Sequence, residues 1–234
     1  MIDSGDFQAA PSVAGQAEVA RRVVLFDFDG VLGRGDAFGS FIRERYARSL
    51  LRKALLLLGL PWWLPLGIFS RWRMLRALVH LSLLGVGEAR YRAQAQAFAG
   101  ALVRQTRRFQ RDGLQALRRH QAAGDRVIVV TGCEDMLVRG ILAELGLGGI
   151  EVLASRLRPT WLGMRQQWHN VGQRKVESLA RYGVTAWQRA YGDTLFDVPM
   201  LKQADEPVLV NGTPKLCKRV EKLLGRSVMR VEWY

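Results

Sequence analysis

Two aspartates, Asp27 and Asp29, lie at the end of the first apolar run of the chain. Side chains alternate along a strand, so both carboxylates are expected on one side while Phe26 and Phe28 point into the core. Gly30 permits a tight turn after the strand. Two carboxylates this close repel each other unless one is protonated or a cation is present, and Mg²⁺ prefers oxygen ligands. The pair therefore predicts a magnesium site, with a simple turn or a calcium loop as the alternatives.

A second acidic pair follows another short apolar run. Asp193 comes directly after that run, and Asp197 stands four residues later, just before a helix start marked by Pro199. Asp197 is therefore also expected to cap that helix, and a turn is the alternative role of Asp193. If both runs are strands of one open parallel sheet, their carboxyl ends meet at the edge where such sheets bind ligands.

Three further residues suit phosphate. Thr131 and Gly132 lie between a predicted strand and a predicted helix, where a hydroxyl and free backbone N–H groups can hold phosphate oxygens. Lys175 lies at the beginning of an amphipathic helix, and taken alone it could be an ordinary solvated lysine. Many α/β turns place a small hydroxyl residue and a glycine between a strand and a helix. These three residues therefore indicate a phosphate site only in combination with the aspartates.

The elements that position these residues alternate between strands and helices. Continuous rather than alternating hydrophobicity indicates strands covered on both faces. The pattern predicts an α/β fold with a doubly wound parallel sheet, and a hairpin over residues 161–168 near the sheet edge. The predicted strands span residues 23–28, 126–131, 189–192 and 207–210, and the predicted helices span 112–123, 135–145, 173–182, 198–203 and 214–224.

A long segment, residues 37–109, has no strand signal and is predicted to be a helical insertion, or cap. It divides the catalytic core into residues 21–36 and 110–234, and residues 1–20 read as a flexible leader. Within the insertion, residues 54–69 contain no charged side chain. These sixteen residues fall short of the about 17–25 that a spanning helix needs, and Pro61 and Pro65 would break a straight helix.

The apolar stretch predicts contact with a membrane. Trp62, Trp63 and Trp72 suit the level of lipid headgroups, and cations flank the stretch. The alternative is a helical turn buried inside a cap. The net charge of +14 and the pI near 10.8 favour a polyanionic partner, and a solvated basic exterior is the alternative. Many cations lie in the insertion and no nucleic-acid motif accompanies them, so a membrane surface is expected rather than nucleic acid. These cations are Arg43, Arg45, Arg48, Arg52, Lys53, Arg71, Arg73 and Arg76.

The order of the motifs resembles the haloacid dehalogenase superfamily of phosphotransferases. The resemblance implies that Asp27 attacks phosphorus and that Asp29 is the general acid and base. It implies that Mg²⁺ is bound by Asp27, the backbone carbonyl of Asp29 and Asp193, with Asp197 steadying the metal's water shell. The residues that would hold the phosphoryl group are Thr131, Gly132 and Lys175.

A narrower likeness concerns the insertion. Its position after the first motif resembles the phosphoserine phosphatase branch. The sequences DAFGSFIRERY from Asp36 and GVGEARY from Gly85, with the apolar stretch between them, resemble the bacterial phosphatidylglycerophosphatase C family. This implies hydrolysis of phosphatidylglycerol phosphate, an anionic phospholipid, at the inner membrane by a catalytic domain that faces the cytoplasm. Asp36 is then a candidate specificity residue, or simply a helix N-cap.

Two other functions stay open at this point. One is a soluble phosphatase of a small molecule such as phosphoserine, with the apolar stretch buried in its cap. The other is a non-catalytic, basic membrane-binding protein, which the complete set of acidic residues disfavours. The N-terminus has no secretory pattern, and Cys133 and Cys217 match no metal-ligand spacing, so a reducing compartment is expected.

Overall fold

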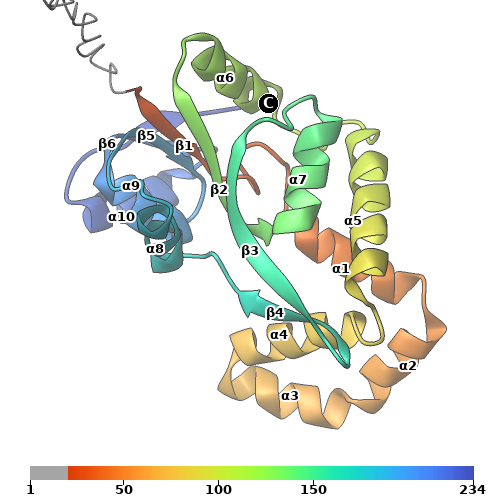
Figure 1. The fold of residues 1–234 in the computed structure, drawn as a ribbon. Coiled ribbons are helices and arrows are strands. Elements are labelled where there is room, and N and C mark those ends of the chain that lie inside the picture. Colours follow the sequence, from red (N-terminus) through yellow and green to blue (C-terminus); the bar gives the residue numbers. More distant parts are fainter. Residues whose placement is uncertain (1–20) are drawn as a thin grey trace, which may run out of the picture.

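A computed structural model describes residues 21–234, except for the side chains of residue 60 and residues 63–66 (Figure 1). The predicted leader, residues 1–20, and the Trp63 side chain lie outside that part. The described chain forms a seven-stranded sheet in the order β4-β3-β2-β1-β5-β6-β7, parallel throughout except for the β3–β4 pair. The predicted α/β fold is therefore confirmed. The strands are β1 (Val23–Phe26), β2 (Arg126–Glu134), β3 (Glu151–Thr160), β4 (Gly163–Trp168), β5 (Trp187–Gly192), β6 (Ala204–Val210) and β7 (Met229–Val231).

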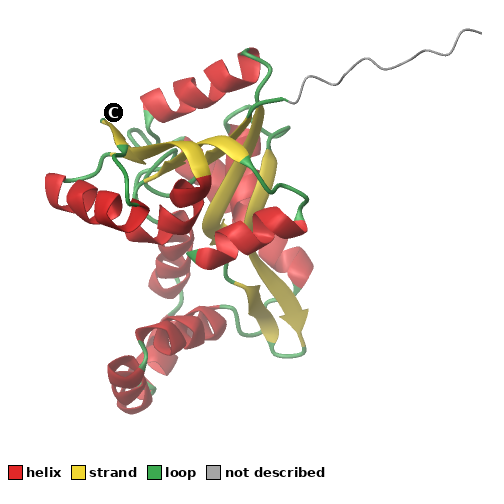
Figure 2. Ribbon diagram, turned by 90° about the vertical axis from the view of Figure 1, so that its left-hand side faces the viewer, coloured by secondary structure: helices red, strands yellow, loops and turns green. Residues whose placement is uncertain are grey.

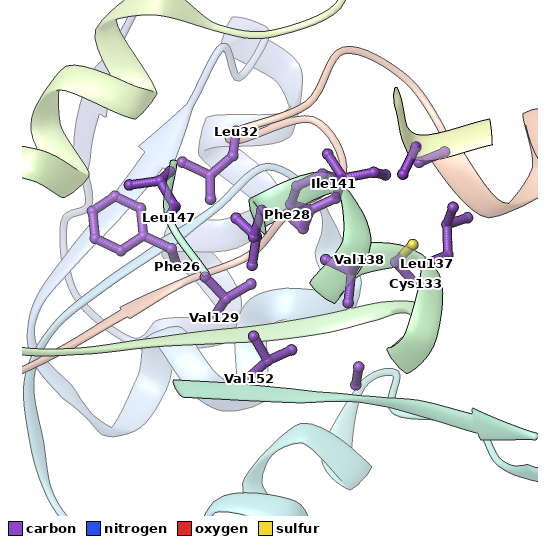
Figure 3. Packing of buried hydrophobic residues seen from close by; sticks show 14 of the residues in the cluster. Phe26, Phe28, Leu32, Val129, Cys133, Leu137, Val138, Ile141, Leu147 and Val152 are labelled. Atoms are coloured by element: carbon purple, nitrogen blue, oxygen red, sulfur yellow. The ribbon is translucent and has the colours of Figure 1, made fainter. Parts of the chain in front are cut away.

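Helices cover both faces of the sheet, and each face has its own hydrophobic cluster. Successive β1 side chains point to opposite faces, so Val24 and Phe26 belong to one cluster and Leu25 to the other. Figure 3 shows Phe26, Phe28 and Val129 packed with side chains of the first cluster. Its helices are α1 (Ala37–Ala47), α5 (Glu88–Val103), α6 (Arg111–Ala122) and α7 (Asp135–Glu144); those of the second are α8 (Gln173–Arg181), α9 (Val198–Gln203) and α10 (Pro214–Leu224).

The predicted helices match the structure to within one residue at each end, but the strands differ more. Strand β1 ends at Phe26 rather than at residue 28, and β2 continues three residues beyond the predicted end. Strands β3 and β7 were not predicted. The hairpin expected over residues 161–168 contains only its turn and β4, since β3 supplies the other strand. The second half of β3 is largely polar and leaves the covered part of the sheet, which explains the weak signal.

Three helices of the insertion, α2 (Leu50–Leu58), α3 (Leu60–Phe69) and α4 (Arg71–Ser82), lie at one end of the molecule (Figures 1 and 2). Gly59 separates α2 from α3 just before Pro61, so the apolar stretch is broken there as predicted, whereas the break expected at Pro65 is wrong because α3 continues through it. Among the described helices, none has both the length and the hydropathy required to cross a membrane. The division into core and insertion stays a prediction, and α1 and α5 share a hydrophobic cluster with the sheet.

Candidate active site

Asp27 is the first residue after β1, at the carboxyl edge of the sheet. Its backbone N–H donates to the Tyr191 carbonyl at 3.0 Å, which continues the β1–β5 ladder by one residue. On the other side, Phe26 is paired with Val129 of β2. This parallel register brings Asp193, which follows β5, and Thr131, near the end of β2, to the same edge as Asp27. The structure thus gathers the first, second and third sequence motifs at one place.

Lys175 of α8 joins two of the carboxylates. Its Nζ lies 2.9 Å from Asp27 Oδ1 and 2.6 Å from Asp197 Oδ1. The side chain is 2% exposed, so the solvated-lysine alternative is wrong. A buried ammonium beside two buried carboxylates is stabilised as a unit, because each charge offsets the desolvation of the others.

The arrangement provides oxygen ligands for a divalent cation. Carboxylate oxygens of Asp27, Asp193 and Asp197 all lie within 4.8 Å of one another. Asp193 Oδ1 is buried and has no hydrogen-bond partner within the described residues. Gly30, at φ +86°, lies against this carboxylate: a Cβ there would stand 1.8 Å from Asp193 Oδ2. Hard cations take such oxygen ligands, so the donor set fits Mg²⁺.

The electrostatics of the cluster also favour a cation. Burial, together with the charges of Asp27 and Asp197, raises the pKa of Asp193 to about 8. Burial raises the pKa of Asp27 to about 6 against the opposing effect of Lys175. Burial also acts to raise the pKa of Asp197, but Lys175 and the Thr194 hydrogen bonds outweigh it and hold this pKa below its ordinary value. A bound cation would favour the ionised form of the carboxyl groups that burial penalises.

Asp197 occupies the N-cap position of α9, as expected, but its side chain makes no capping hydrogen bond to that helix. Its Oδ2 instead accepts hydrogen bonds from the backbone N–H groups of Asp193 and Thr194, at 3.2 and 3.0 Å, and from the Thr194 hydroxyl at 2.9 Å. The physical reason is the pull of Lys175, which holds the other oxygen inside the site. Asp197 therefore fixes the loop that carries Asp193.

Asp29 and Asp36 lie beside this cluster. Asp29 Oδ1 accepts the Ala37 N–H at 2.9 Å, and burial raises the pKa of Asp29 to about 8. The described carboxylate cluster does not include its side chain, as expected if only its carbonyl faces a metal. Asp36 caps α1, since its Oδ1 accepts the Gly39 N–H at 2.7 Å. The N-cap role of Asp36 is confirmed, whereas its role in specificity stays a prediction.

Thr131 and Gly132 lie in the irregular end of β2 rather than in a loop, because the ladder with β3 shifts register between Val130 and Glu134. The Thr131 side chain is fully buried, and its Oγ1 accepts the Cys133 N–H at 3.0 Å. The Gly132 carbonyl accepts the Ser155 hydroxyl at 2.7 Å. Because the sequence did not predict β3, it did not place Ser155 beside Gly132.

A second residue that the sequence did not reveal is Asn170. Its backbone N–H donates to Ser155 Oγ at 2.9 Å, and its side-chain amide donates to the Leu153 carbonyl at 2.9 Å. A Cβ on Gly132 would stand 2.8 Å from the neighbouring Val171, so the two segments pack closely. Asn170 and Ser155 therefore hold Gly132 in place.

Known proteins resemble this chain over most of its length. The family model for haloacid dehalogenase-like hydrolases matches residues 24–202. Protein CicA of Caulobacter vibrioides is 31% identical over 203 residues, which cover 79% of this chain and 83% of CicA. A solved structure from Bordetella pertussis Tohama I, described as a protein of unknown function, has a TM-score of 0.66 at 20% identity and covers 89% of this chain and 98% of its own. A substrate-bound phosphoserine phosphatase has a TM-score of 0.55 at 18% identity, with coverage of 90% and 92%.

Proposed function

This chain belongs to the haloacid dehalogenase-like hydrolase family, and we propose that it hydrolyses phosphate monoesters through a phosphoryl group carried on Asp27. The observation that supports this most directly is the buried cluster of Asp27, Asp193 and Asp197 around Lys175. It provides a carboxylate nucleophile, ligands for a cation and a fixed positive charge within one site. Folding alone does not call for such an arrangement, because apolar side chains of similar volume would stabilise the core at least as well.

The reaction has two halves. In the first, a carboxylate oxygen of Asp27 attacks phosphorus while the bond from phosphorus to the alcohol oxygen breaks, and Asp29 gives that oxygen a proton. In the second, water attacks phosphorus and loses a proton to Asp29, so that phosphate leaves and Asp27 is restored. The covalent intermediate divides one difficult step into two, and acid–base assistance of this kind contributes about 10²–10⁴ in rate.

Other residues hold the reacting groups. Lys175 would bind a phosphoryl oxygen, because its Nζ lies 2.9 Å from the attacking carboxylate. The Thr131–Gly132 segment would bind the other phosphoryl oxygens. Asp27, Asp193 and the carbonyl of Asp29 would hold Mg²⁺, and Asp197 would order its water shell. When bound, Mg²⁺ neutralises negative charge on the phosphate and on the carboxylates around it.

We further propose that the substrate is a phospholipid monoester, phosphatidylglycerol phosphate, met at the inner membrane from the cytoplasmic side. The support is the surface of α2, α3 and α4, where large apolar side chains face solvent in a region rich in arginine. Exposed apolar patches of this kind are typical of interaction surfaces, and cations beside them favour anionic lipid. The exposed apolar side chains include Leu50, Leu51, Leu57, Leu58, Trp62, Ile68, Phe69 and Trp72.

A small soluble monoester such as phosphoserine remains the second candidate. The fold-level similarity to phosphoserine phosphatase favours it. However, that candidate was expected to bury the apolar stretch inside the cap, whereas Ile68 and Phe69 are 84% and 86% exposed. A non-catalytic membrane-binding protein would not need the buried acidic cluster, and phosphate release would exclude it.

The decisive test compares phosphate release from phosphatidylglycerol phosphate in mixed micelles with release from phosphoserine. We expect kcat/KM to be at least about 100-fold higher for the lipid, since the apolar surface contributes binding energy only there. Chelation of Mg²⁺ should lower both activities at least about 100-fold, and added Mg²⁺ should restore them. Faster turnover of phosphoserine would reject the lipid substrate but keep the reaction. Full activity in the presence of excess chelator would reject the metal site.

Membrane contact has its own prediction. We expect Phe69→Glu to weaken binding to vesicles that contain phosphatidylglycerol by about 10- to 100-fold, because a fully buried large side chain contributes about 1.5–3 kcal/mol. The measurement is co-sedimentation with vesicles. Leu223→Glu is the matched control, since Leu223 is 52% exposed on α10, away from α2–α4 (Figure 1). Equal binding of the two variants would contradict the proposed surface.

A further inference from the structure

A cavity of about 360 Å³ lies between the β3–β4 ladder and helix α8, and none of its lining residues belongs to the acidic cluster. Its volume falls within the range of about 300–1,000 Å³ that is common for small-molecule sites. Two guanidinium groups line it together with polar and apolar side chains, and the described lining residues include no carboxylate. The lining side chains used below are those of Arg156, Gln167, Trp168, Ser178, Arg181 and Tyr182.

A β-bulge shapes the strand side of the cavity. Arg156 of β3 pairs with Trp168 of β4. The next residue of β3, Leu157, pairs with Gln166, so Gln167 is an extra residue on β4. Consecutive residues of a regular strand point to opposite faces, and a bulge re-aims the side chains beside it. Because of the bulge, Gln167 and Trp168 both line the same cavity.

Two arginines of α8 lie over the Trp168 ring. The guanidinium carbon of Arg181 is 4.6 Å from the ring centre and that of Arg174 is 5.1 Å away, so two like charges lie close together. Glu177 precedes Arg181 by four residues, a spacing that allows an ion pair, but the Arg181 guanidinium lies over the tryptophan instead. Within the described chain, neither Arg156 nor Arg181 pairs with a carboxylate. The cavity therefore gathers positive charge that the protein does not neutralise.

Hydrogen bonds hold Trp168 in place. Its Nε1 donates to Ser178 Oγ at 3.2 Å, and that hydroxyl donates to Asn170 Oδ1 at 2.7 Å. A fixed ring restricts the arginine above it before any ligand binds, which lowers the entropy cost of binding. A cavity lined by one sign of charge also concentrates ions of the opposite sign. Two guanidinium groups balance a dianion, and their planar N–H donors match the oxygens of a phosphate group.

We propose that this cavity is a second ligand site, which binds a phosphorylated small molecule dissolved in water. Arg156 and Arg181 bind its phosphate group, and its organic part lies against Tyr182, which is 49% exposed. No lining residue comes from α2, α3 or α4, so the site is separate from the proposed membrane surface and a dissolved ligand is expected rather than a lipid headgroup. The site does not depend on the proposed phosphatase activity, because it shares no residue with the acidic cluster.

The test is calorimetry of the full chain with inorganic phosphate and with glycerol 3-phosphate, in excess chelator, after circular dichroism has shown that the fold is kept. Without Mg²⁺ the carboxylates of the acidic cluster repel an anion, so the heat reports on the cavity.

The arginine variants show where the probes bind. Arg156→Ala and Arg181→Ala should each weaken the binding of both probes at least about tenfold, because charge-assisted hydrogen bonds are lost. Arg181→Lys should restore only part of the affinity, since an ammonium lacks the planar fork of donors. Arg119→Ala, at an exposed position of α6 on the opposite face of the sheet, should match wild type.

Two results would overturn the proposal. One is that wild type binds neither probe with a Kd below about 10 mM. The other is that both alanine variants bind the probes as tightly as wild type does. Vesicles of phosphatidylglycerol and phosphatidic acid test the source of the phosphate: Arg181→Ala should co-sediment with them as wild type does. If it binds the vesicles at least about tenfold more weakly while its affinity for glycerol 3-phosphate is unchanged, the cavity recognises a lipid headgroup and the dissolved ligand is rejected.

Discussion

We expect Asp27→Asn to lose phosphatase activity by at least about 10⁴-fold, because an amide cannot act as the nucleophile that attacks phosphorus. The variant should fold, since the amide has nearly the same shape and removes a buried charge whose burial is costly. Phosphate release from a monoester in the presence of Mg²⁺ measures the effect, and circular dichroism measures the fold.

A matched control distinguishes the loss of the nucleophile from the effect of replacing any aspartate near the site. Asp135→Asn removes a carboxylate near the end of β2 that pairs with Arg139 on the surface, an interaction worth less than about 1 kcal/mol. It should retain wild-type turnover. Rapid acid quenching during turnover, followed by mass spectrometry, should find a phosphoryl group on the wild-type peptide that contains Asp27. Normal hydrolysis by Asp27→Asn would end the proposed mechanism.

Replacing Lys175 with Met should have the second-largest effect, on both stability and activity. Without its ammonium, Asp27 and Asp197 are left as buried charges with no compensating cation. Breaking a buried pair in this way typically costs about 3–5 kcal/mol, which corresponds to a fall in Tm of about 6–20 °C for a chain of this size. Activity should also fall at least about 100-fold, since the variant has lost a positive charge beside the phosphoryl group.

Two comparisons make this prediction specific. Lys202→Met, at an exposed position on α9, should change stability by less than about 0.5 kcal/mol. Mg²⁺ should raise the Tm of Lys175→Met more than that of wild type, because the cation offsets the charges that the lysine no longer neutralises. A Lys175→Met protein as stable as Lys202→Met, with or without Mg²⁺, would show that the buried network has no role in folding.

Much of the fold could be predicted because local signals agree with the tertiary arrangement. The helices α9 and α10 occupy the predicted residues 198–203 and 214–224, where Pro199 and Pro214 mark the first turns. The first strand was recognisable because all its residues face hydrophobic surroundings. Strand β3 was missed since only its first half is buried, and β7 was missed since its three residues lie at the sheet edge. A short or half-exposed strand is stabilised by its neighbours rather than by its own sequence.

The candidate site was predictable in its residue types but not in its contacts. Asp27 and Asp193 were expected at the same edge of the sheet because both follow parallel strands, and they lie near each other because β1 and β5 are neighbours. The sequence did not determine that Lys175 would be buried between Asp27 and Asp197, because a lysine at the start of an amphipathic helix is more often solvated. It placed Asp197 correctly at the N-cap of α9 but did not reveal its side-chain contacts, which run back to Thr194 and across the site to Lys175.

The sequence by itself determined the α/β class, the strand ends that carry the carboxylates and the helical character of residues 37–109, because periodicity and turn residues act over a few neighbouring positions. Only the tertiary structure decided which oxygens meet Lys175 and that Trp72 reaches Phe196 across more than a hundred residues of chain. It also decided which Asp193 oxygen has no hydrogen-bond partner in the part of the chain that the structure describes. Those contacts depend on strand register and on how α4 packs along β4, and neither is encoded in any one segment.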